Sequence, residues 1–388
     1  MNSRMHPLAA PRLLAGFLLL VASTHSATAV PPPNKVLFDA TKAEMAANAD
    51  WIVDADVYNI GTGVGGAMTV GAGSEANPAR FPTPAASGIT AATLETYWKG
   101  AMSAWAVALV KRGFSVETLP LGSRITYGDS TNAQDLNNYG IFVMCEPNIL
   151  LTLAEKNAIV RFVADGGGLF MIGDHNASDR NSDGSDSVDV INDLAATNGI
   201  AANPFGIVSN INSLSVISSF VATSATDPLI HGPVGAVAQM QYSAGATLTI
   251  SGANAHGAIW RTAARASNDV MVGYSTYGLG KVVMCGDSSP FDDGTGDTND
   301  NLFFGWSGEV NGDHADLAMN ACVWLNPVAA APPCPADVND SGAVDGADLA
   351  QVLQSWGRCT GCAADIDGSG AVNGADLATI LQSWGACP

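Results

Sequence analysis

Residues Tyr139–Gly173 read YGIFVMCEPNILLTLAEKNAIVRFVADGGGLFMIG and predict a strand, a helix and a second strand. The two ends, Tyr139–Cys145 and Leu169–Gly173, are short and almost wholly apolar, which is typical of strands buried on both faces of a sheet. Between them, Thr152–Ala164 carries apolar residues at helical spacing and stops before three consecutive glycines. Because parallel strands need a crossover of this kind, the stretch indicates a parallel sheet.

The chain before and after this stretch continues the same pattern. The predicted elements are strands at 35–39 and 115–119 around a helix at 89–112, a hairpin of 269–276 and 281–285, and a closing helix at 315–325. Helices that alternate with buried strands cover both faces of a sheet. We therefore predict an α/β fold over residues 30–325, with a doubly wound and mostly parallel sheet.

The first 29 residues predict an export signal. Arg4 and Arg12 make the beginning basic, and Leu13–Ala22 is an apolar run too short to span a bilayer comfortably. Ala27–Ala29 has the small-x-small pattern of a cleavage site, so we expect the mature, secreted chain to begin at Val30. The alternative is an uncleaved membrane anchor. No later segment has the length and apolar character of a membrane span.

Charge limits the kinds of partner that the chain can have. It contains 36 acidic and 16 basic residues, and its formal net charge is −20. This excess of negative charge argues against nucleic acid or an anionic membrane surface as a partner. It favours divalent cations and a solvated, secreted surface.

Two segments near the C-terminus are copies of each other. Ala336–Cys359 reads ADVNDSGAVDGADLAQVLQSWGRC and Ala364–Cys387 reads ADIDGSGAVNGADLATILQSWGAC, with 17 of 24 positions identical. Each copy begins with oxygen-bearing side chains at alternate positions and continues into a helix with one apolar stripe. Such a stripe needs a partner, so we expect the two copies to pack against each other. The stripe residues are Leu349, Val352, Leu353 and Trp356 in the first copy and Leu377, Ile380, Leu381 and Trp384 in the second.

The alternating oxygen ligands predict a calcium site in each copy. Calcium takes about six to eight oxygens from a coiled loop, and Gly342 and Gly370 permit the sharp turn that this coil needs. Zinc or copper would need His or thiolate ligands instead. The predicted ligands are Asp337, Asn339, Ser341, Asp345, Asp348 and the Ala343 carbonyl in the first copy, and Asp365, Asp367, Ser369, Asn373, Asp376 and the Ala371 carbonyl in the second.

This pattern resembles the dockerin module, a pair of EF-hand-like calcium loop–helix repeats that attaches secreted proteins to partner modules or surfaces. The resemblance implies two bound Ca2+ ions, a small all-α domain over residues 334–388, and either a cohesin-like partner or a cell-surface anchor. Ser341 and Ser369 stand where Asp or Asn usually coordinates, which predicts weaker affinity. A linker rich in Pro and Ala, residues 326–333, separates this domain from the α/β domain.

Four of the seven cysteines bracket the two copies. They are Cys334, Cys359, Cys362 and Cys387, which can pair in three ways. We expect one disulfide inside each bracket, because exported proteins meet oxidising conditions. A calcium-free domain held by disulfides is the alternative.

The remaining cysteines lie in the α/β domain. Cys145 and Cys285 end strands among apolar neighbours and predict buried thiols, with a bond between Cys285 and Cys322 as the alternative.

Acidic residues follow two of the predicted strands of the α/β domain. The first loop holds Asp174 and His175, and the second holds Asp287, with Asp292 and Asp293 behind it. Open α/β sheets have their sites at the C-terminal ends of parallel strands, so we predict Asp174, His175 and Asp287 as catalytic residues. A His beside carboxylates binds a metal, acts as a general base, or caps a loop through hydrogen bonds.

The first of these loops also repeats the start of a calcium loop. Asp179, Asn181 and Asp183 have the spacing of calcium ligands, and Val190 stands where the final acid is expected. The loop therefore predicts a further metal near Asp174, Asp179 and Asp183, with a solvated polar loop as the alternative.

Three architectural features of residues 35–325 are shared with a known family. They are Asp165–Gly168 after the helix, the strand LFMIGD, and the late hairpin Tyr277–Asp287. With these features the domain resembles the class I glutamine-amidotransferase-like, flavodoxin-like superfamily. That family places a nucleophilic cysteine in a glycine-flanked turn, where this chain has Ile172–Asn176 and no thiol. We therefore do not expect cysteine-dependent amidotransfer.

Two functions follow as hypotheses. The first is a secreted hydrolase of extracellular polymer, because dockerin-like tails resemble those of polysaccharide-degrading enzymes. Asp174, His175 and Asp287 would then supply acid and base for cleaving O-glycosyl bonds, or hold a metal that activates water. The second is a non-catalytic ligand-binding or scaffold domain, anchored to the cell surface or to a multiprotein complex. Convergence of these residues with His314 in one cleft would favour catalysis, and scatter would favour binding.

Overall fold

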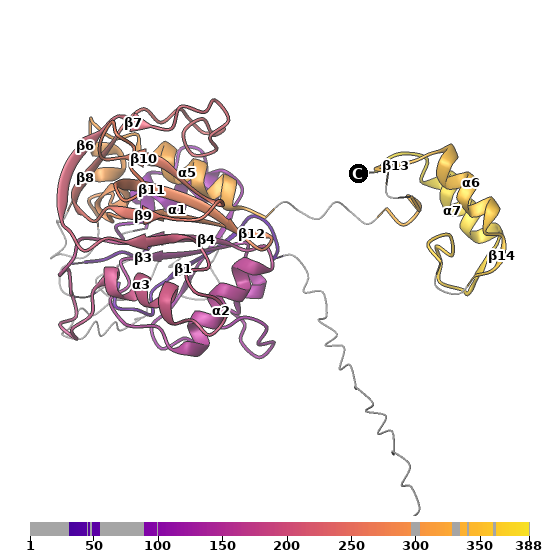
Figure 1. Cartoon of the computed structure of the whole chain (residues 1–388), viewed down its shortest axis with the longest axis horizontal. Helices are drawn as coiled ribbons and strands as arrows, with labels where there is room; N and C mark the ends of the chain where they lie inside the picture. The colour runs from indigo at the N-terminus through magenta and orange to yellow at the C-terminus, as the bar shows by residue number, and fades with distance from the viewer. Residues whose placement is uncertain are drawn as a thin grey trace, which may run out of the picture.

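A computed structural model describes residues 31–44, 46, 49–54, 89–98, 100–295, 303–327, 334–339, 341–359 and 362–387. The predicted export signal and most of the predicted linker lie outside these ranges. In the described part of the chain, no helix is long and apolar enough to cross a membrane. Figure 1 shows an α/β domain and a smaller C-terminal unit.

A ten-stranded sheet forms the centre of the α/β domain (Figure 1). Five of its strands are parallel neighbours in the order β2–β1–β3–β4–β12, which confirms the predicted parallel sheet. They are β1 (Lys35–Asp39), β2 (Ser115–Leu119), β3 (Ile141–Cys145), β4 (Gly168–Ile172) and β12 (Gly280–Cys285). The strand order reverses between β1 and β3, and open α/β sheets have their binding sites at such a reversal.

The sheet continues beyond β12 as an antiparallel half. The predicted hairpin is confirmed, because β11 (Val270–Tyr277) pairs antiparallel with β12. The other antiparallel strands were not predicted. They are β5 (Ile207–Ser209), β7 (Phe220–Val221), β9 (Leu248–Ile250) and β10 (Ala255–Trp260), with a separate pair of β6 (Leu214–Ser218) and β8 (Met240–Gly245).

Helices cover both faces of the sheet, as predicted for a doubly wound fold. Successive residues of a strand point to opposite faces, so Val36 and Phe38 belong to the core under α1 and α5, and Leu37 belongs to the core under α2 and α3. Burial of these two apolar cores is the main stabilising contribution. The four helices are α1 (Ser103–Lys111), α2 (Leu153–Ala164), α3 (Ser187–Thr197) and α5 (His314–Leu325).

The helix predicted over residues 89–112 is shorter in the structure. It begins only at Ser103, because the preceding backbone contacts a neighbouring segment. The amide of Met102 donates to the Ile52 carbonyl, and a Cβ at Gly100 would lie 2.2 Å from the same oxygen. These contacts replace the helical hydrogen bonds. The remaining helices of this domain are short: η1 (Glu95–Tyr97), η2 (Leu136–Asn138), η3 (Ser289–Phe291) and α4 (Gly305–Gly308).

The C-terminal unit consists of two loop–helix copies joined by short strands. Capping boxes start both helices, with Asp345 and Asp348 in the first and Asn373 and Asp376 in the second. The unit is not all-α as predicted, because β13 pairs with β16 and β14 with β15, each time across the two copies. The elements are β13 (Ala343–Val344), α6 (Gly346–Gln354), β14 (Gly357–Arg358), β15 (Ala371–Val372), α7 (Gly374–Gln382) and β16 (Gly385–Ala386).

The disulfides of this unit do not follow the predicted pairing. Cys334 pairs with Cys387, and Cys359 pairs with Cys362, so neither bond lies inside one bracket. The crossed strands explain this difference. Because β16 lies beside the first loop, the residue after it, Cys387, reaches Cys334 rather than the cysteine of its own copy.

The apolar stripes of α6 and α7 are only partly buried. Val352 and Ile380 are fully buried in a small core with Val344 and Val372. The two copies pack against each other as expected, but four residues of the stripes stay about half exposed. These are Leu353 (52%), Trp356 (53%), Leu381 (57%) and Trp384 (52%).

Candidate functional site

Four parallel strands deliver a carboxylate to the same edge of the sheet. β3, β4 and β12 end level with one another in register. Glu146, Asp174 and Asp287 follow these strand ends within two residues, and Asp39 is the last residue of β1. The sheet topology thus brings the predicted Asp174 and Asp287 to one edge, together with two acids that were not predicted.

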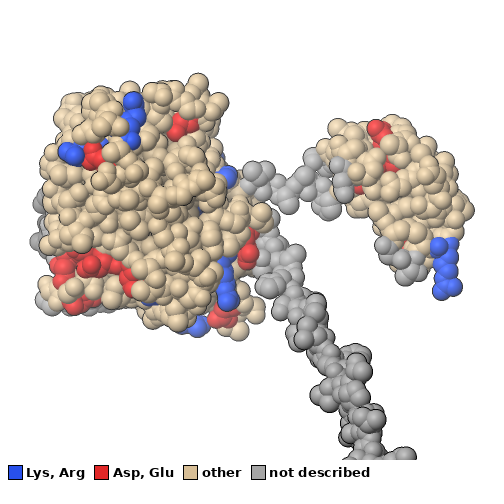
Figure 2. Space-filling model, viewed as in Figure 1, with Lys and Arg blue, Asp and Glu red and all other residues tan. Residues whose placement is uncertain are grey.

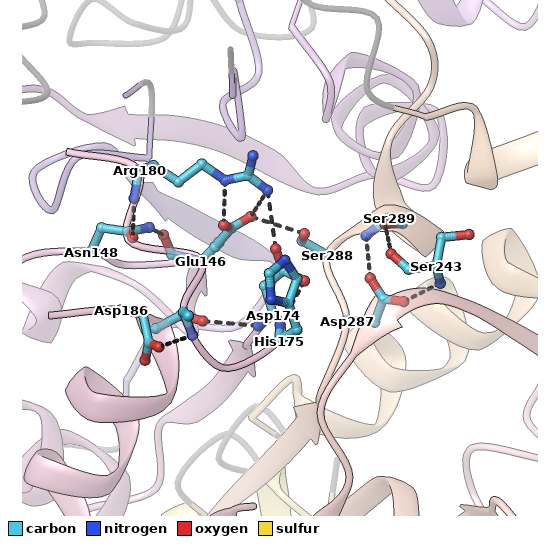
Figure 3. A network of polar contacts seen from close by, with 12 residues as sticks. Glu146, Asn148, Asp174, His175, Arg180, Asp186, Ser243, Asp287, Ser288 and Ser289 are labelled. Carbon is cyan, nitrogen blue, oxygen red and sulfur yellow. Dashed lines mark hydrogen bonds and ion pairs between the residues drawn. The ribbon is translucent and has the colours of Figure 1, made fainter. Parts of the chain in front are cut away.

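Arg180 joins two of these carboxylates (Figure 3). Its Nε lies 2.5 Å from Glu146 Oε1, and its Nη2 lies 3.0 Å from Asp174 Oδ2. The Ser288 hydroxyl donates to Glu146 Oε2 at 3.0 Å, and the His175 amide donates to Asp174 Oδ1 at 2.7 Å. Every carboxylate oxygen of Glu146 and Asp174 therefore accepts a hydrogen bond within the protein. Glu146 is completely buried and Asp174 is 3% exposed, so this ion pair is shielded from water.

Asp287 has hydrogen-bond donors of its own. The Ser289 amide donates to Oδ1 at 2.9 Å, and the Ser243 amide on β8 donates to Oδ2 at 2.5 Å. Figure 3 shows the carboxylate turned toward these two amides and away from Arg180. Asp287 thus satisfies a backbone donor on the edge of β8 that is not paired with a strand.

Burial changes the protonation of these acids. It raises the pKa of Asp174 well above its ordinary value; the charges of Glu146 and Asp287 add to this rise, and Arg180 opposes it. Burial also raises the pKa of Asp287 to about 6, against the lowering effect of the amide donors Ser289 and Ser243. A raised pKa keeps a carboxylic acid neutral at higher pH, which a general acid requires.

The two candidate histidines have other partners. The ring of His175 is partly exposed, and its Nδ1 lies 2.7 Å from the Asn176 carbonyl oxygen. His314 is fully buried at the start of α5, where its Nε2 accepts from the Gln241 amide at 3.0 Å and its Nδ1 lies 2.8 Å from the Gly305 carbonyl oxygen. Burial lowers the pKa of His314. In the described residues, no hydrogen bond joins either ring to Asp174 or Asp287.

Asp292 and Asp293 lie behind Asp287 and are also buried. Asp293 Oδ2 accepts from the Ala104 amide at 2.7 Å and so caps the start of α1. Burial raises the pKa of Asp293 to about 6 and that of Asp292 to about 7, and in Asp292 the neighbouring charge of Asp293 adds to the effect. Asp293 therefore has a structural role of its own.

The loop after β1 contains buried polar residues that were not predicted. Asp39, Thr41 and Glu44 are at most 7% exposed, and one oxygen of each has no hydrogen-bond partner in the described part of the chain. Burial raises the pKa of Asp39 to about 6, and burial together with the charge of Asp39 raises that of Glu44 well above its ordinary value. Between them, Lys42 forms a 2.7 Å ion pair with Glu155. The sequence signal that could have revealed this loop is the predicted strand KVLFD, which ends in Asp39. This strand is β1, and the strand order of the sheet reverses between β1 and β3.

The cysteines of the α/β domain are Cys145, Cys285 and Cys322, and all three are free and buried. The alternative bond between Cys285 and Cys322 is therefore wrong. Burial raises the pKa of Cys285 and Cys322 to about 12, and that of Cys145 well above its ordinary value. Thiols that stay neutral are poor nucleophiles.

A cavity of about 310 Å³ lies between α1 and α5. Trp306 and Met319 line its apolar part, and Lys111 and Asp316 are among the charged residues around it. None of the predicted catalytic residues lines this cavity. It is separate from the carboxylates at the strand ends.

The loop before α3 has the turn of a calcium loop but a different end. Asp179 Oδ2 accepts from the Gly184 amide at 2.8 Å, as Asp337 Oδ2 accepts from Gly342 at 2.7 Å. The capping acid Asp189 on α3 is exposed to solvent, whereas the acids that close the two C-terminal loops are buried. Figure 2 shows an acidic patch in the area of α3 on an otherwise largely uncharged face. The metal expected near Asp174, Asp179 and Asp183 stays a prediction.

The second C-terminal loop groups three carboxylates. Asp365, Asp367 and Asp376 each offer one oxygen, and these oxygens lie within 4.8 Å of one another. Burial acts to raise the pKa of Asp376. Hydrogen bonds from the amides of Asn373, Asp367 and Ile366 outweigh this effect, so the pKa lies below its ordinary value. Ionised oxygens grouped in this way can hold a divalent cation.

The first loop has the same turn, but only two of the three positions that correspond to Asp365, Asp367 and Asp376 are acidic. Asp337 and Asp348 match Asp365 and Asp376, and Asn339 stands in the place of Asp367. The hydroxyl of Ser341 donates to the Ala343 carbonyl at 3.0 Å, so two predicted ligands contact each other. In the second loop, Ser369 and Ala371 form the same contact at 3.1 Å. The predicted ligands Asp345 and Asn373 cap the helices through the amides of Ala347 and Ala375.

Solved structures resemble this chain only distantly. No family model matches the chain, and no curated protein matches it. The cytoplasmic protein STM1381 from Salmonella typhimurium LT2 aligns with a TM-score of 0.39 at 14% identity, covering 75% of this chain and 99% of that one. A ThuA-like protein from Bacteroides uniformis gives 0.35 at 13% identity, covering 78% and 94%. A beta-galactosidase from Rahnella sp. R3 gives 0.33 at 15% identity, covering 58% and 27%. Similarity at this level carries no functional argument.

Proposed function

We propose that the chain is a secreted protein whose C-terminal unit binds two Ca2+ ions and attaches the α/β domain to a partner. The observation that carries this proposal is the grouping of Asp365, Asp367 and Asp376 oxygens within 4.8 Å. Three carboxylates at that spacing repel one another unless a cation lies between them. The first loop repeats the turn with Asp337 and Asp348, so the same role extends to it.

The half-exposed apolar residues of α6 and α7 support the attachment role. Leu353 and Trp356 on one helix correspond to Leu381 and Trp384 on the other, so the unit presents two similar apolar patches. Exposed apolar patches that contain Trp are typical of protein contact sites. A cohesin-like module or a cell-surface protein is the partner that we propose.

Calcium titration of the full chain tests this role. Saturation at about 100 times the dissociation constant stabilises a unit by about 2.7 kcal/mol per site, so the melting temperature of the C-terminal unit should rise. Magnesium serves as the control, because it favours a smaller, octahedral site. An unchanged melting temperature at millimolar calcium would contradict the proposal.

For the α/β domain, we propose a non-catalytic ligand-binding or scaffold role. Every oxygen of Glu146, Asp174 and Asp287 accepts from a donor of the protein itself. Carboxylates that are buried and satisfied in this way hold strand ends together, and at no more than 3% exposure they offer little surface to a substrate. This favours the second of the two functional hypotheses.

Hydrolysis of an extracellular polymer, such as a polysaccharide, is the second candidate. The observation in its favour is the raised pKa of Asp174 beside Glu146, and of Asp287 farther along the same edge. A neutral acid near an ionised carboxylate is the arrangement that cleaves glycosidic bonds. In this candidate Asp174 is the general acid, and His175 and Asp287 assist it.

Assays of the full chain on a panel of glycans and esters separate these candidates. Under hydrolysis, Asp174→Asn should abolish turnover, and Asp189→Asn, an exposed acid on α3, should keep it. Turnover that depends on Asp174 would overturn the non-catalytic role. Retention of the unmutated chain on an insoluble glycan without any turnover would support that role.

A further inference from the structure

Each calcium loop of the C-terminal unit is closed by the other copy. β13, which follows the turn of the first loop, pairs with β16 after α7. β15, in the second loop, pairs with β14 after α6. The amide of Cys387 donates to the Gly342 carbonyl at 3.0 Å, and the amide of Cys359 donates to the Gly370 carbonyl at 3.1 Å. The two closures are therefore equivalent.

The two disulfides repeat this equivalence. In the first loop, Cys334 lies three residues before the first ligand, Asp337, whose amide donates to the Cys334 carbonyl at 2.9 Å. In the second, Cys362 bears the same relation to Asp365 at 3.1 Å. Each of these cysteines is bonded to the cysteine that follows the helix of the opposite copy. A covalent bond and a strand pair thus fix the entrance of each loop to the far end of the other helix.

A short path connects the two groups of ligands. The Ala343 carbonyl is a predicted ligand on β13, and β13 pairs with β16, which follows α7. The first turn of α7 carries Asp376, a ligand of the second loop. The reverse path runs from Ala371 through β15, β14 and α6 to Asp348. An ion that fixes the first loop therefore also fixes β16 and α7, and α7 carries a ligand of the second loop. The same holds in reverse for β14 and α6.

We propose that the two loops bind calcium as one coupled unit, with the second loop filled first. The order follows from geometry: each loop has three Asp among its predicted ligands, but of the described residues only Asp365, Asp367 and Asp376 of the second loop already bring three carboxylate oxygens within 4.8 Å of one another. Binding there fixes α7 and β16, and so prepares β13 for the second ion. This inference rests on the proposed calcium binding and adds the linkage between the two sites.

Calcium titration calorimetry on the full chain tests the coupling. The unmutated chain should bind two ions with a Hill coefficient above 1. Asp365→Asn, which weakens the second loop, should lower the affinity of the intact first loop by at least about fivefold. Asp189→Asn is the control, because it removes an exposed acid of the α/β domain.

A second variant tests the coupling without removing a ligand. The pair Cys334→Ser with Cys387→Ser keeps every predicted ligand and removes one cross-link. It should reduce the Hill coefficient toward 1 and weaken the first loop more than the second. Two independent sites, with the first unaffected by Asp365→Asn, would overturn the coupling. Absence of calcium binding in the unmutated chain would instead overturn the proposed function from which it starts.

Discussion

The two parts of the chain use their carboxylates in opposite ways. In the α/β domain, Glu146 and Asp174 are buried and share the guanidinium of Arg180. In the C-terminal unit, Asp365 and Asp367 lie with Asp376 in one group, and none of them forms an ion pair with Lys or Arg in the described residues. The first arrangement contains its own cation, and the second is the one for which we propose a bound cation.

Under the proposed function, this difference separates structural acids from ligand-binding acids. Both groups were visible in the sequence as acidic loops, and composition alone could not tell them apart. What distinguishes them is a cation within the protein: Arg180 pairs with Glu146 and Asp174, whereas backbone amides and a hydroxyl donate to Asp365, Asp367 and Asp376. Tests that remove a donor, a cross-link, a proton or a ligand should therefore affect the two parts differently.

The largest effect is expected from Arg180→Ala. It leaves Glu146 buried and without its cation, which costs about 3–5 kcal/mol of unfolding free energy in the α/β domain. Denaturant unfolding of that domain measures the change. Arg161→Ala, on the exposed side of α2, is the control and should change the unfolding free energy by less than about 0.5 kcal/mol. Equal effects of the two variants would remove the distinction between the two kinds of acid.

The next effect concerns the disulfides of the C-terminal unit. Removing Cys334–Cys387 should destabilise the unit by about 4 kcal/mol, because the bond closes a chain segment with a separation of 53 residues. Removing Cys359–Cys362, with a separation of 3, should cost about 2 kcal/mol. Calorimetry of the paired Ser variants measures the melting of both parts. The α/β domain should melt at an unchanged temperature in both.

A moderate effect is expected from pH. The native α/β domain holds protons on Asp39, Asp287, Asp292 and Asp293 that an unfolded Asp, with a pKa near 3.8, has released. These groups therefore favour folding most below about pH 4, and their contribution is lost as the pH rises to about 7. With calcium saturating, calorimetry should show this domain melting about 4 °C lower at pH 8 than at pH 5.

The opposite pH dependence is expected for calcium binding. Protons compete for the carboxylates of the C-terminal loops, so affinity should rise from pH 4 to pH 6. Asp292→Asn should reduce the pH dependence of the α/β domain and leave calcium affinity unchanged. If both parts gained stability with rising pH, the contrast between their acids would be wrong.

The smallest effect is expected at the loop before α3. Asp179→Asn should leave the calcium-dependent rise in melting temperature unchanged, because the acid Asp189 of this loop is exposed. Asp365→Asn should reduce that rise. Differential scanning calorimetry with and without calcium compares the two variants. A reduction by Asp179→Asn would show a third calcium site in the α/β domain.

The core of the fold could be predicted because its signals are local. The alternation of Val36 and Phe38 with Leu37 places them on opposite faces, and Thr152 marks the start of α2 through its capping box with Glu155. The late start of α1 could not be predicted in this way. It depends on a backbone contact with Ile52, about fifty positions away in the chain.

The site was predicted only in part, for a similar reason. Asp174 and Asp287 follow from the rule that parallel strands end at one edge, but the partner Arg180 comes from a loop whose position no local pattern gives. The disulfide pairing failed because the two copies are nearly identical. Cys359 and Cys387 occupy equivalent positions in their copies, so sequence cannot decide which of them meets Cys334.

The bond between Cys334 and Cys387 also determines how the C-terminal unit transmits mechanical force. The linker enters the unit at Cys334, so tension from the α/β domain arrives at this residue. If a partner grips α7, the load crosses the disulfide to Cys387 and β16, and it bypasses the first loop and α6. If the unit is the attachment site that we propose, it can be pulled in this direction without stretching the loop between Asp337 and Asp348.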